Sequence, residues 1–387
     1  MKTIWEYDLP TNENSSDFQY ESPIFFKDNY VYYISGLLCQ KTLHIVDMES
    51  GLGITEELVT KNHCLPSKYF FLEFQDTILI YAGDLFTYQK GVLAKTVDLS
   101  GKGEVKSYLV KENKLFFVCS QSKESLFCYN LETQKIDWQL NITNSKQYVA
   151  GELTLCDNLL ACYGKDQLLF IETERGRIVD QIKIPRIEKL FCPIKVDEEH
   201  LIIGYTNWSN AGILKYDTVT KQVIWRHKRK FEGPQLKCKI YRHNDDIFWV
   251  KNDTELICLN IEDGSEKYQF RTNPWLYTNL QFIQDNMIYG TSGADGYINN
   301  VDPKTGMKKW SVFLKNGCAY YDVYENSIIV GDFNKEMKQI SLENGSILQN
   351  YCVDGEVVGD IKVHKDCVYT VIWGSSEKEI RLVKIKI

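Results

Sequence analysis

Short apolar runs alternate with polar turns along this chain, in a phrase that recurs nine times. Each copy is an apolar run, an acidic or amide-rich turn and a second apolar run, as in KDNYVYYI, QDTILIYA and QDNMIYGT. The turns, 36 to 48 residues apart, are at Asp28, Asp76, Glu112, Asp157, Glu198, Asp245, Asp285, Glu325 and Asp366. A period of about 40–45 residues built from short strands is typical of a propeller blade.

A second repeat runs out of phase with the first. It has an acid or amide, two residues, Thr or Ser, then Gly, and an aromatic residue four positions later. The fullest copy holds Asp302, Thr305, Gly306 and Trp310. Partial copies end at Trp138, Trp225 and Tyr268, and weaker ones centre on Gly51, Gly91, Gly176 and Gly345. The acid or amide caps its own turn, and Gly takes the positive-φ position of a tight hairpin. We expect strain at Gln134 and Lys221, which replace that Gly, and we expect the aromatic residues to pack between blades.

Interleaving the two repeats predicts four strands per unit, with the inner strand first. Eight units are complete, and the last, within residues 355–387, has only three strands. Residues 2–8 place Trp5 like the other repeated tryptophans, so this segment should supply the missing fourth strand and close the edge. The sequence therefore predicts an all-β fold over 1–387: a single closed β-propeller domain of nine four-stranded antiparallel blades. Eight blades is the alternative if the short unit at 76–103 is not a true blade.

The stretch GADGYINNVDPKTGMKKW resembles the PQQ-type (quinoprotein-like) propeller repeat, within the wider group of WD40-like β-propellers. The resemblance implies blade geometry over nearly the whole chain. Quinone-dependent dehydrogenases of this superfamily hold calcium and a quinone in the central channel, below a disulfide between adjacent cysteines. No two of the twelve cysteines here are adjacent, and no residue matches a catalytic position. We therefore carry over no catalytic residue and expect no cofactor.

Composition and local motifs exclude several classes of function and location. A net charge of −7 argues against nucleic-acid binding. No stretch approaches 18 uncharged apolar residues, so we expect no membrane span. The N-terminus lacks the apolar region of a secretory signal, and the scattered cysteines suit small buried side chains in a reducing compartment, so we expect a cytoplasmic protein. The six histidines have no metal-ligand spacing, and no catalytic motif is present, so we expect no metal.

Function is expected from residues that depart from the repeat. Partner-binding candidates in loops and strand ends of 205–277 are Trp208, Arg226, Lys228, Arg229, Lys230, Phe231, Trp275 and Tyr277. Exposed aromatic side chains beside Arg are typical of protein-recognition hot spots. Trp275 capping the channel wall, and a solvated outer strand for the basic run, are the competing interpretations. We expect a monomeric, non-catalytic scaffold that binds a protein partner through one propeller face.

The alternative is an enzyme or a small-ligand or carbohydrate-binding propeller that uses the central channel. Polar residues of the inner strands could converge there, namely Glu152, Lys239, Gln281, Asp322 and Asp360. These residues could equally solvate a water-filled funnel.

Overall fold

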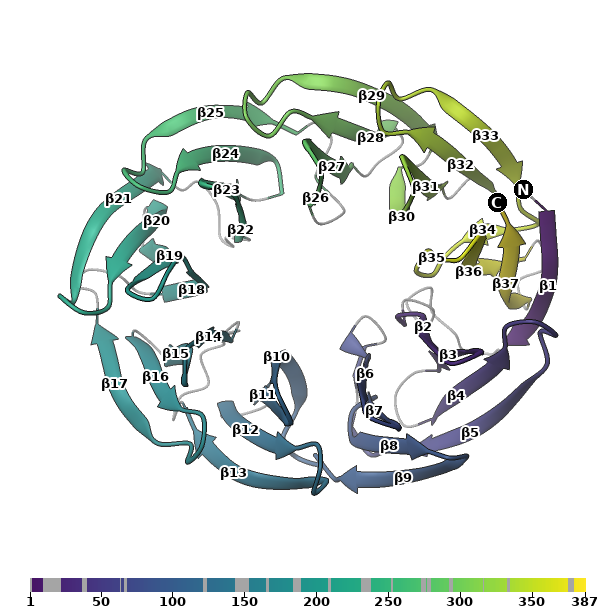
Figure 1. The fold of residues 1–387 in the computed structure, drawn as a ribbon, viewed down its shortest axis with the longest axis horizontal. Coiled ribbons are helices and arrows are strands. Elements are labelled where there is room, and N and C mark those ends of the chain that lie inside the picture. The colour runs from purple at the N-terminus through teal and green to yellow at the C-terminus, as the bar shows by residue number, and fades with distance from the viewer. Residues whose placement is uncertain are drawn as a thin grey trace. The chain divides into compact units, whose positions relative to one another are not determined.

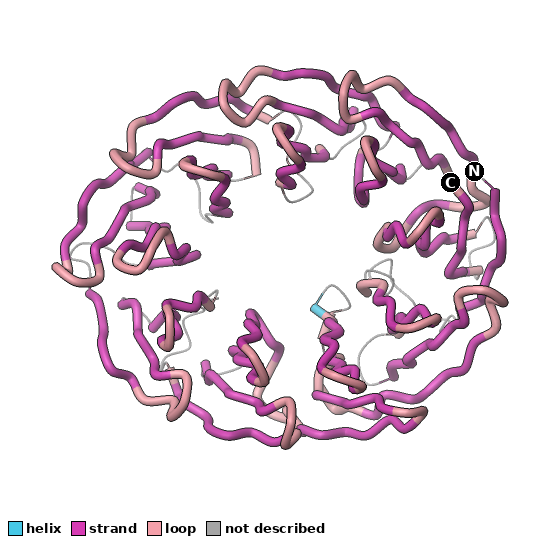
Figure 2. Tube along the Cα trace, in the orientation of Figure 1, coloured by secondary structure: helices cyan, strands magenta, loops and turns pink. Residues whose placement is uncertain are grey.

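The chain forms nine antiparallel sheets, the blades of a nine-bladed β-propeller fold. The computed structural model describes all residues except 1, 10–21, 37–39, 63, 66–67, 121–123, 143–152, 165–166, 184–188, 208–209, 231–237, 252, 273–275, 277–279, 292–294, 316, 333–334 and 375–378. The prediction of nine blades is confirmed, and the short unit at 76–103 contributes to a true blade of four strands. Figure 2 shows strands joined by turns in every blade.

The described chain divides into two compact units. The first contains residues 1–82, 86–94 and 271–387. Its first and second blades are β2 (Phe25–Lys27), β3 (Tyr30–Ser35), β4 (Gln40–Asp47), β5 (Gly53–Val59), and β6 (Phe70–Phe74), β7 (Thr77–Tyr81), β8 (Leu85–Gln89), β9 (Val92–Val97). Its seventh and eighth blades are β26 (Gln281–Ile283), β27 (Asn286–Gly290), β28 (Asp295–Val301), β29 (Lys308–Lys315), and β30 (Cys318–Tyr324), β31 (Ser327–Asp332), β32 (Glu336–Ser341), β33 (Ile347–Cys352).

The second unit contains residues 83–85 and 95–270. Its third and fourth blades are β10 (Glu104–Lys111), β11 (Lys114–Ser120), β12 (Glu124–Asn130), β13 (Lys135–Asn141), and β14 (Thr154–Cys156), β15 (Leu159–Gly164), β16 (Gln167–Glu172), β17 (Ile178–Lys183). Its fifth and sixth blades are β18 (Lys189–Lys195), β19 (His200–Asn207), β20 (Asn210–Asp217), β21 (Gln222–Lys230), and β22 (Cys238–His243), β23 (Asp246–Lys251), β24 (Glu255–Asn260), β25 (Glu266–Arg271). That the two units make a single domain stays a prediction.

The ninth blade combines both ends of the chain, in the first unit. It contains β34 (Glu356–Val357), β35 (Lys362–His364), β36 (Cys367–Trp373), β37 (Ile380–Lys386) and β1 (Lys2–Leu9). Strand β1 pairs antiparallel with β37, beside which it lies in Figure 1, and Glu6 forms an ion pair with Arg381 at 2.5 Å. The predicted completion of the last blade by the N-terminal strand is therefore confirmed.

The local chemistry of each blade follows from the repeated sequence. Strands in the middle of a blade are buried on both faces, as in β7 and β36. Their sequences are therefore continuous apolar runs. The fourth strands have one wetter face and alternate, as in β13 and β21. Gln134 and Lys221 carry φ angles of 55° and 59°, which confirms the strain expected where a side chain replaces glycine.

The hydrophobic core lies between consecutive blades. Trp5, Tyr33 and Tyr369, from the ninth and first blades, share one cluster of buried side chains. Similar clusters join the third to the fourth blade, the fourth to the fifth and the seventh to the eighth. Six of the described free cysteines are buried, five of them on strands. In these pairs, consecutive blades thus bury apolar faces against each other, as repeat units must.

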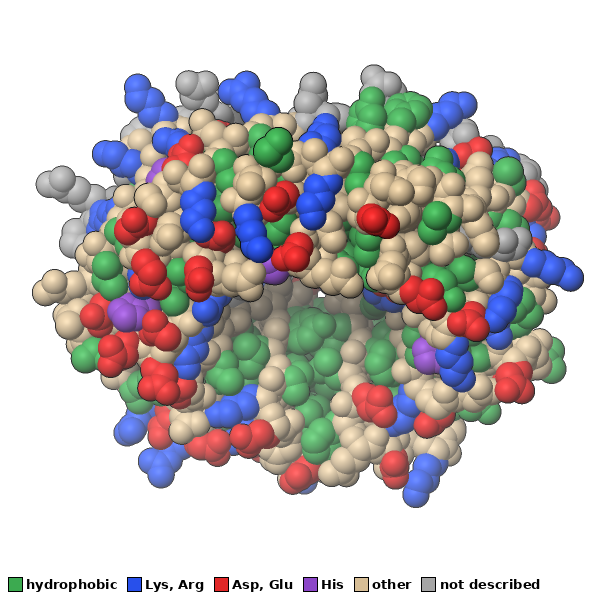
Figure 3. Space-filling view, turned by 45° about the horizontal axis from the view of Figure 1, so that its top comes forward, with side chains coloured by type: hydrophobic (Ala, Val, Ile, Leu, Met, Phe, Trp, Pro, Cys, Tyr) green, Lys and Arg blue, Asp and Glu red, His purple; other side chains and the backbone are tan. Residues whose placement is uncertain are grey.

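Charge is mixed on the surface. Acidic and basic side chains are interspersed over the face shown in Figure 3. Within the described part of the chain, the structure contains no helix of the length and apolarity that crossing a bilayer requires.

Candidate functional site: a groove between the first and second blades

A tryptophan joins neighbouring blades at four places in the molecule. Its ring lies against a glycine in the turn between the third and fourth strands of the next blade. The pairs are Trp5 with Gly51, Trp138 with Gly176, Trp225 with Gly264, and Trp310 with Gly345. A Cβ atom added at these glycines would lie only 2.4–2.7 Å from the ring. Each glycine also has a positive φ, so both close approach and backbone geometry require it.

The indole nitrogen fixes the same contact. Nε1 of Trp5 donates to the Met48 carbonyl at 3.0 Å, and Nε1 of Trp310 donates to the Leu342 carbonyl at 2.9 Å. The corresponding bonds of Trp138 and Trp225 reach the carbonyls of Thr173 and Ile261. The predicted role of these tryptophans in packing between blades is confirmed.

The first blade departs from this arrangement. In the four blades that have the tryptophan, the strand register shifts just before it. The shift places the tryptophan opposite an equivalent position of the third strand, as with Trp225 opposite Lys215. Strand β5 pairs with β4 without such a shift, so Ile54 stands opposite Ile45. Ile54 therefore occupies the tryptophan position, and its side chain is shorter and cannot donate a hydrogen bond.

The second blade lacks the glycine turn against which the tryptophan packs in four other blade pairs. Its third and fourth strands are joined by the two-residue turn Lys90–Gly91, with φ angles of 50° and 80°. A Cβ atom added at Gly91 would meet no atom within 4 Å. Because the indole and the longer turn are both missing, a groove of about 530 Å³ opens between the two blades. This volume falls in the range of roughly 300–1,000 Å³ found for ligand sites.

The groove combines aromatic, aliphatic and charged side chains. Its lining residues, all in the first unit, are Lys27, Asp28, Tyr30, Tyr32, Ile45, Asp47, Leu52, Gly53, Ile54, Asp76, Ile78, Tyr88, Lys90 and Gly91. We call this set the tyrosine groove. The rings of Tyr32 and Tyr88 meet edge to face at 6.0 Å.

Apolar side chains at the rim of the tyrosine groove are open to water. The exposed fractions are 76% for Leu52, 55% for Ile54 and 42% for Tyr30. Val92, directly after Gly91, is 65% exposed. Clustered exposure of this kind marks surfaces that other molecules cover.

Some polar and charged side chains of the tyrosine groove have hydrogen-bond or ion-pair partners, and burial changes the pKa of others. Lys27 Nζ donates to the Gln75 carbonyl at 2.9 Å and lies 3.4 Å from Glu73. Hydrogen bonds, chiefly from the backbone N–H of Ser50, lower the pKa of Asp47. Burial, followed by nearby Tyr88 and Asp28, raises the pKa of Tyr32 to about 12, so this phenol stays protonated at neutral pH.

The fourth and fifth blades show another way to replace the indole. The tryptophan position there is Asp180, opposite Phe170, and the glycine position in the next blade is Lys221. These two side chains form an ion pair at 2.9 Å, and the cavity beside them measures about 180 Å³. The tyrosine groove has no such substitute at Ile54 and is about three times larger.

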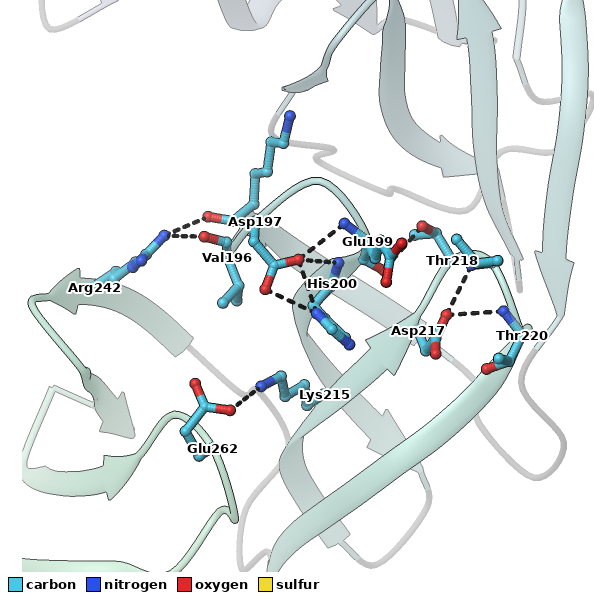
Figure 4. Close-up of polar contacts among 12 residues, drawn as sticks. Val196, Asp197, Glu199, His200, Lys215, Asp217, Thr218, Thr220, Arg242 and Glu262 are labelled. Carbon is cyan, nitrogen blue, oxygen red and sulfur yellow. Dashed lines mark hydrogen bonds and ion pairs between the residues drawn. The ribbon is translucent and has the colours of Figure 1, made fainter.

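The acidic turns of the fifth blade act as hairpin caps, as predicted. Asp197 Oδ1 accepts hydrogen bonds from the backbone N–H groups of Glu199 and His200, both at 2.9 Å (Figure 4). Asp217 caps the later turn through the N–H groups of Val219 and Thr220. Within the described ranges, no group of three His, Cys, Asp or Glu side chains could hold a metal ion.

The sequence-predicted partner residues are only partly placed. Trp208, Phe231, Trp275 and Tyr277 lie outside the described residues. The basic candidates Arg226, Lys228, Arg229 and Lys230 lie on β21. Of these, Arg229 is only partly exposed and forms an ion pair with Glu266, whereas the other three are exposed. The structure thus brings the basic run onto one strand, and its binding role stays a prediction.

The polar candidates for the channel lie on separate strands. Lys239 belongs to β22 and Gln281 to β26, while Glu152 lies outside the described residues. Asp322 accepts a hydrogen bond from the Val363 N–H at 2.7 Å. Burial is the largest influence on Asp360 and raises the pKa of its carboxyl group, which lies 3.5 Å from Lys362.

Sequence reasoning did not identify the tyrosine groove. One signal was present: the weak repeat copies at Gly51 and Gly91 lack the aromatic residue at the position where other copies have it. The size of the opening depends on two blades together and could not be read from either copy alone.

Comparisons with known proteins agree with this architecture. Residues 209–371 match the family model described as outer membrane protein assembly factor BamB, a PQQ-type repeat. No curated protein sequence gives a significant match. Among solved structures, BamB from Moraxella catarrhalis has a TM-score of 0.54 at 13% identity, covering 82% of this chain and 96% of that one.

Two further structures share the fold. The computationally designed Ika8 protein matches with a TM-score of 0.57 at 12% identity, over 100% of both chains. The quinohemoprotein alcohol dehydrogenase ADHIIG from Pseudomonas putida HK5 matches with a TM-score of 0.54 at 10% identity, over 99% of this chain and 76% of that one. With the nine blades and their repeated turns, these findings show a PQQ-like β-propeller fold, in which residues 209–371 are similar to the BamB family model.

Proposed function

We propose that this protein is a binding scaffold that recognises a protein partner, and that the tyrosine groove is a docking site. The observation that carries the proposal is the groove itself, where the contact between blades found elsewhere in the chain is missing and apolar side chains line the opening. The similarity of residues 209–371 to the family model described as outer membrane protein assembly factor BamB supports a role exercised on other proteins. A cytoplasmic monomer remains part of this proposal.

The test fills the groove with a tryptophan side chain, the residue that packs between other blades. Ile54→Trp places an indole at the ladder position that tryptophan holds in four other blades. Ile224→Trp is the matched control, because Ile224 is an exposed isoleucine on the fourth strand of another blade. Thermal unfolding of both variants establishes that they fold.

Peptides are then selected from a random displayed library on the unmodified protein, and their affinities are measured by calorimetry. We expect selected peptides to bind Ile54→Trp at least tenfold more weakly than the unmodified protein, and Ile224→Trp unchanged. Failure to select any peptide, or equal binding to both variants, would overturn the groove as a docking site. Stabilisation by small molecules that Ile54→Trp abolishes, without any selected peptide, would instead support a small-ligand function.

A further inference from the structure

We propose that the tyrosine groove accepts an aromatic side chain of the partner that is flanked by lysine or arginine. This inference rests on the proposed function and specifies the chemistry of the docked segment. Three features carry it: the repeated indole contacts elsewhere in the chain, the tyrosine lining, and the carboxylates around the groove.

The aromatic anchor follows from comparing blades within one molecule. At four blade pairs an indole covers the turn of the neighbouring blade. In the groove, Ile54 holds the equivalent ladder position, while Tyr30, Tyr32 and Tyr88 line the space around it. Aromatic rings pack favourably edge to face against one another, as Tyr32 and Tyr88 already do. An aromatic side chain from outside would pack against these three tyrosines, in the space that an indole fills between other blades.

The basic flanks follow from charge. Of the five charged lining residues, three are acidic and two are basic. Lys27 is engaged by Glu73 and the Gln75 carbonyl, Asp47 caps its own turn, and Lys90 lies in the turn before Gly91. Among the described residues, neither Asp28 nor Asp76 has an ion-pair or hydrogen-bond partner through its carboxylate. A cationic side chain beside the anchor would neutralise these two groups and lie near tyrosine rings, which attract cations through their faces.

The experiment uses three synthetic heptapeptides. The first has a central tryptophan between two lysines, the second replaces the tryptophan by alanine, and the third replaces both lysines by glutamates. Each is titrated into the unmodified protein, the double variant Asp28→Asn/Asp76→Asn, and the control Asp245→Asn/Asp285→Asn, which changes turn acids of other blades. Titrations are made at low and at moderate salt.

We expect the first peptide to bind the unmodified protein and the control at least tenfold more tightly than either altered peptide. The Asp28→Asn/Asp76→Asn variant should lose most of the preference for lysine over glutamate while keeping the preference for tryptophan. Higher salt should weaken only the lysine preference.

Failure is separable from failure of the proposed function. If library peptides bind in a manner that Ile54→Trp abolishes, but the three heptapeptides bind equally or not at all, the aromatic-basic chemistry is wrong and the docking site stands. If library peptides show no sensitivity to Ile54→Trp, the docking site itself is wrong.

Discussion

Single buried polar residues in the first blade are held by specific partners. His44 is fully buried, with Nε2 at 2.7 Å from the Ser35 hydroxyl and Nδ1 at 3.4 Å from the Tyr7 hydroxyl. Burial lowers the pKa of His44 to about 4. Lys41 is also buried, and its ammonium group donates to the carbonyls of Asn62 and Ala82 at 3.0 and 2.6 Å. Such groups stabilise the fold only while their protonation state and partners are maintained.

His44 makes stability depend on pH. Its folded pKa of about 4 is below the ordinary value of 6.5, so the unfolded chain takes up a proton first on acidification. The contribution of neutral His44 to the free energy of unfolding is complete above about pH 6.5 and is lost as pH falls toward 4. Over that interval the free energy of unfolding falls by about 1.4 kcal/mol per pH unit. Between pH 7 and 5, the free energy of unfolding measured with denaturant should fall less steeply for His44→Gln than for the unmodified protein. The control His243→Gln should behave like the unmodified protein. Parallel curves, or an NMR titration of His44 near pH 6.5, would contradict this.

At the scale of elements, one recurring contact joins the fourth strand of a blade to a turn in the next. Where the contact is complete, as for Trp310 and Gly345, the side chain is buried and its nitrogen is hydrogen-bonded. Where it is changed, the chain uses an ion pair, as with Asp180 and Lys221, or leaves a groove beside Ile54. The same strand position is thus buried between blades at Trp310 and exposed to solvent at Ile54.

Replacing the buried tryptophan and the exposed isoleucine by alanine should lower the free energy of unfolding by different amounts. Trp310→Ala removes a buried indole and its hydrogen bond, so we expect a loss of about 3–5 kcal/mol in the free energy of unfolding. Ile54→Ala, at the exposed equivalent position, should change it by less than about 0.5 kcal/mol. Denaturant unfolding measures both, and similar losses would show that Ile54 packs as the tryptophans do.

At the scale of the whole molecule, the two ends of the chain meet in one sheet. Strand β1 covers the edge of β37, and Arg381 links Glu6 to Asp354 by ion pairs. An uncovered β37 would present unpaired backbone groups to other strands, which promotes association between molecules.

Removing residues 1–9 should therefore lower the melting temperature and produce oligomers. Because the strand binds through backbone pairing and buries Trp5 and Leu9, a synthetic peptide of residues 2–9 should restore the monomer when added in trans. A peptide with Trp5 and Leu9 replaced by Ser is the control. Size-exclusion chromatography would contradict the prediction if the truncated chain stayed monomeric without peptide.

The sequence by itself determined the blades. Alternating apolar runs, turns that need positive φ, and a repeat of about 42 residues are local properties, so they predicted the nine sheets and the addition of the N-terminal strand to the last one. Trp310 and Gly345 were visible as repeat members for the same reason. Only the tertiary structure decided where the repeat leaves space, because the tyrosine groove arises from Ile54 in one blade and the short turn at Gly91 in the next. That relation depends on strand register and on the distance between blades, and neither is encoded in a single turn or strand.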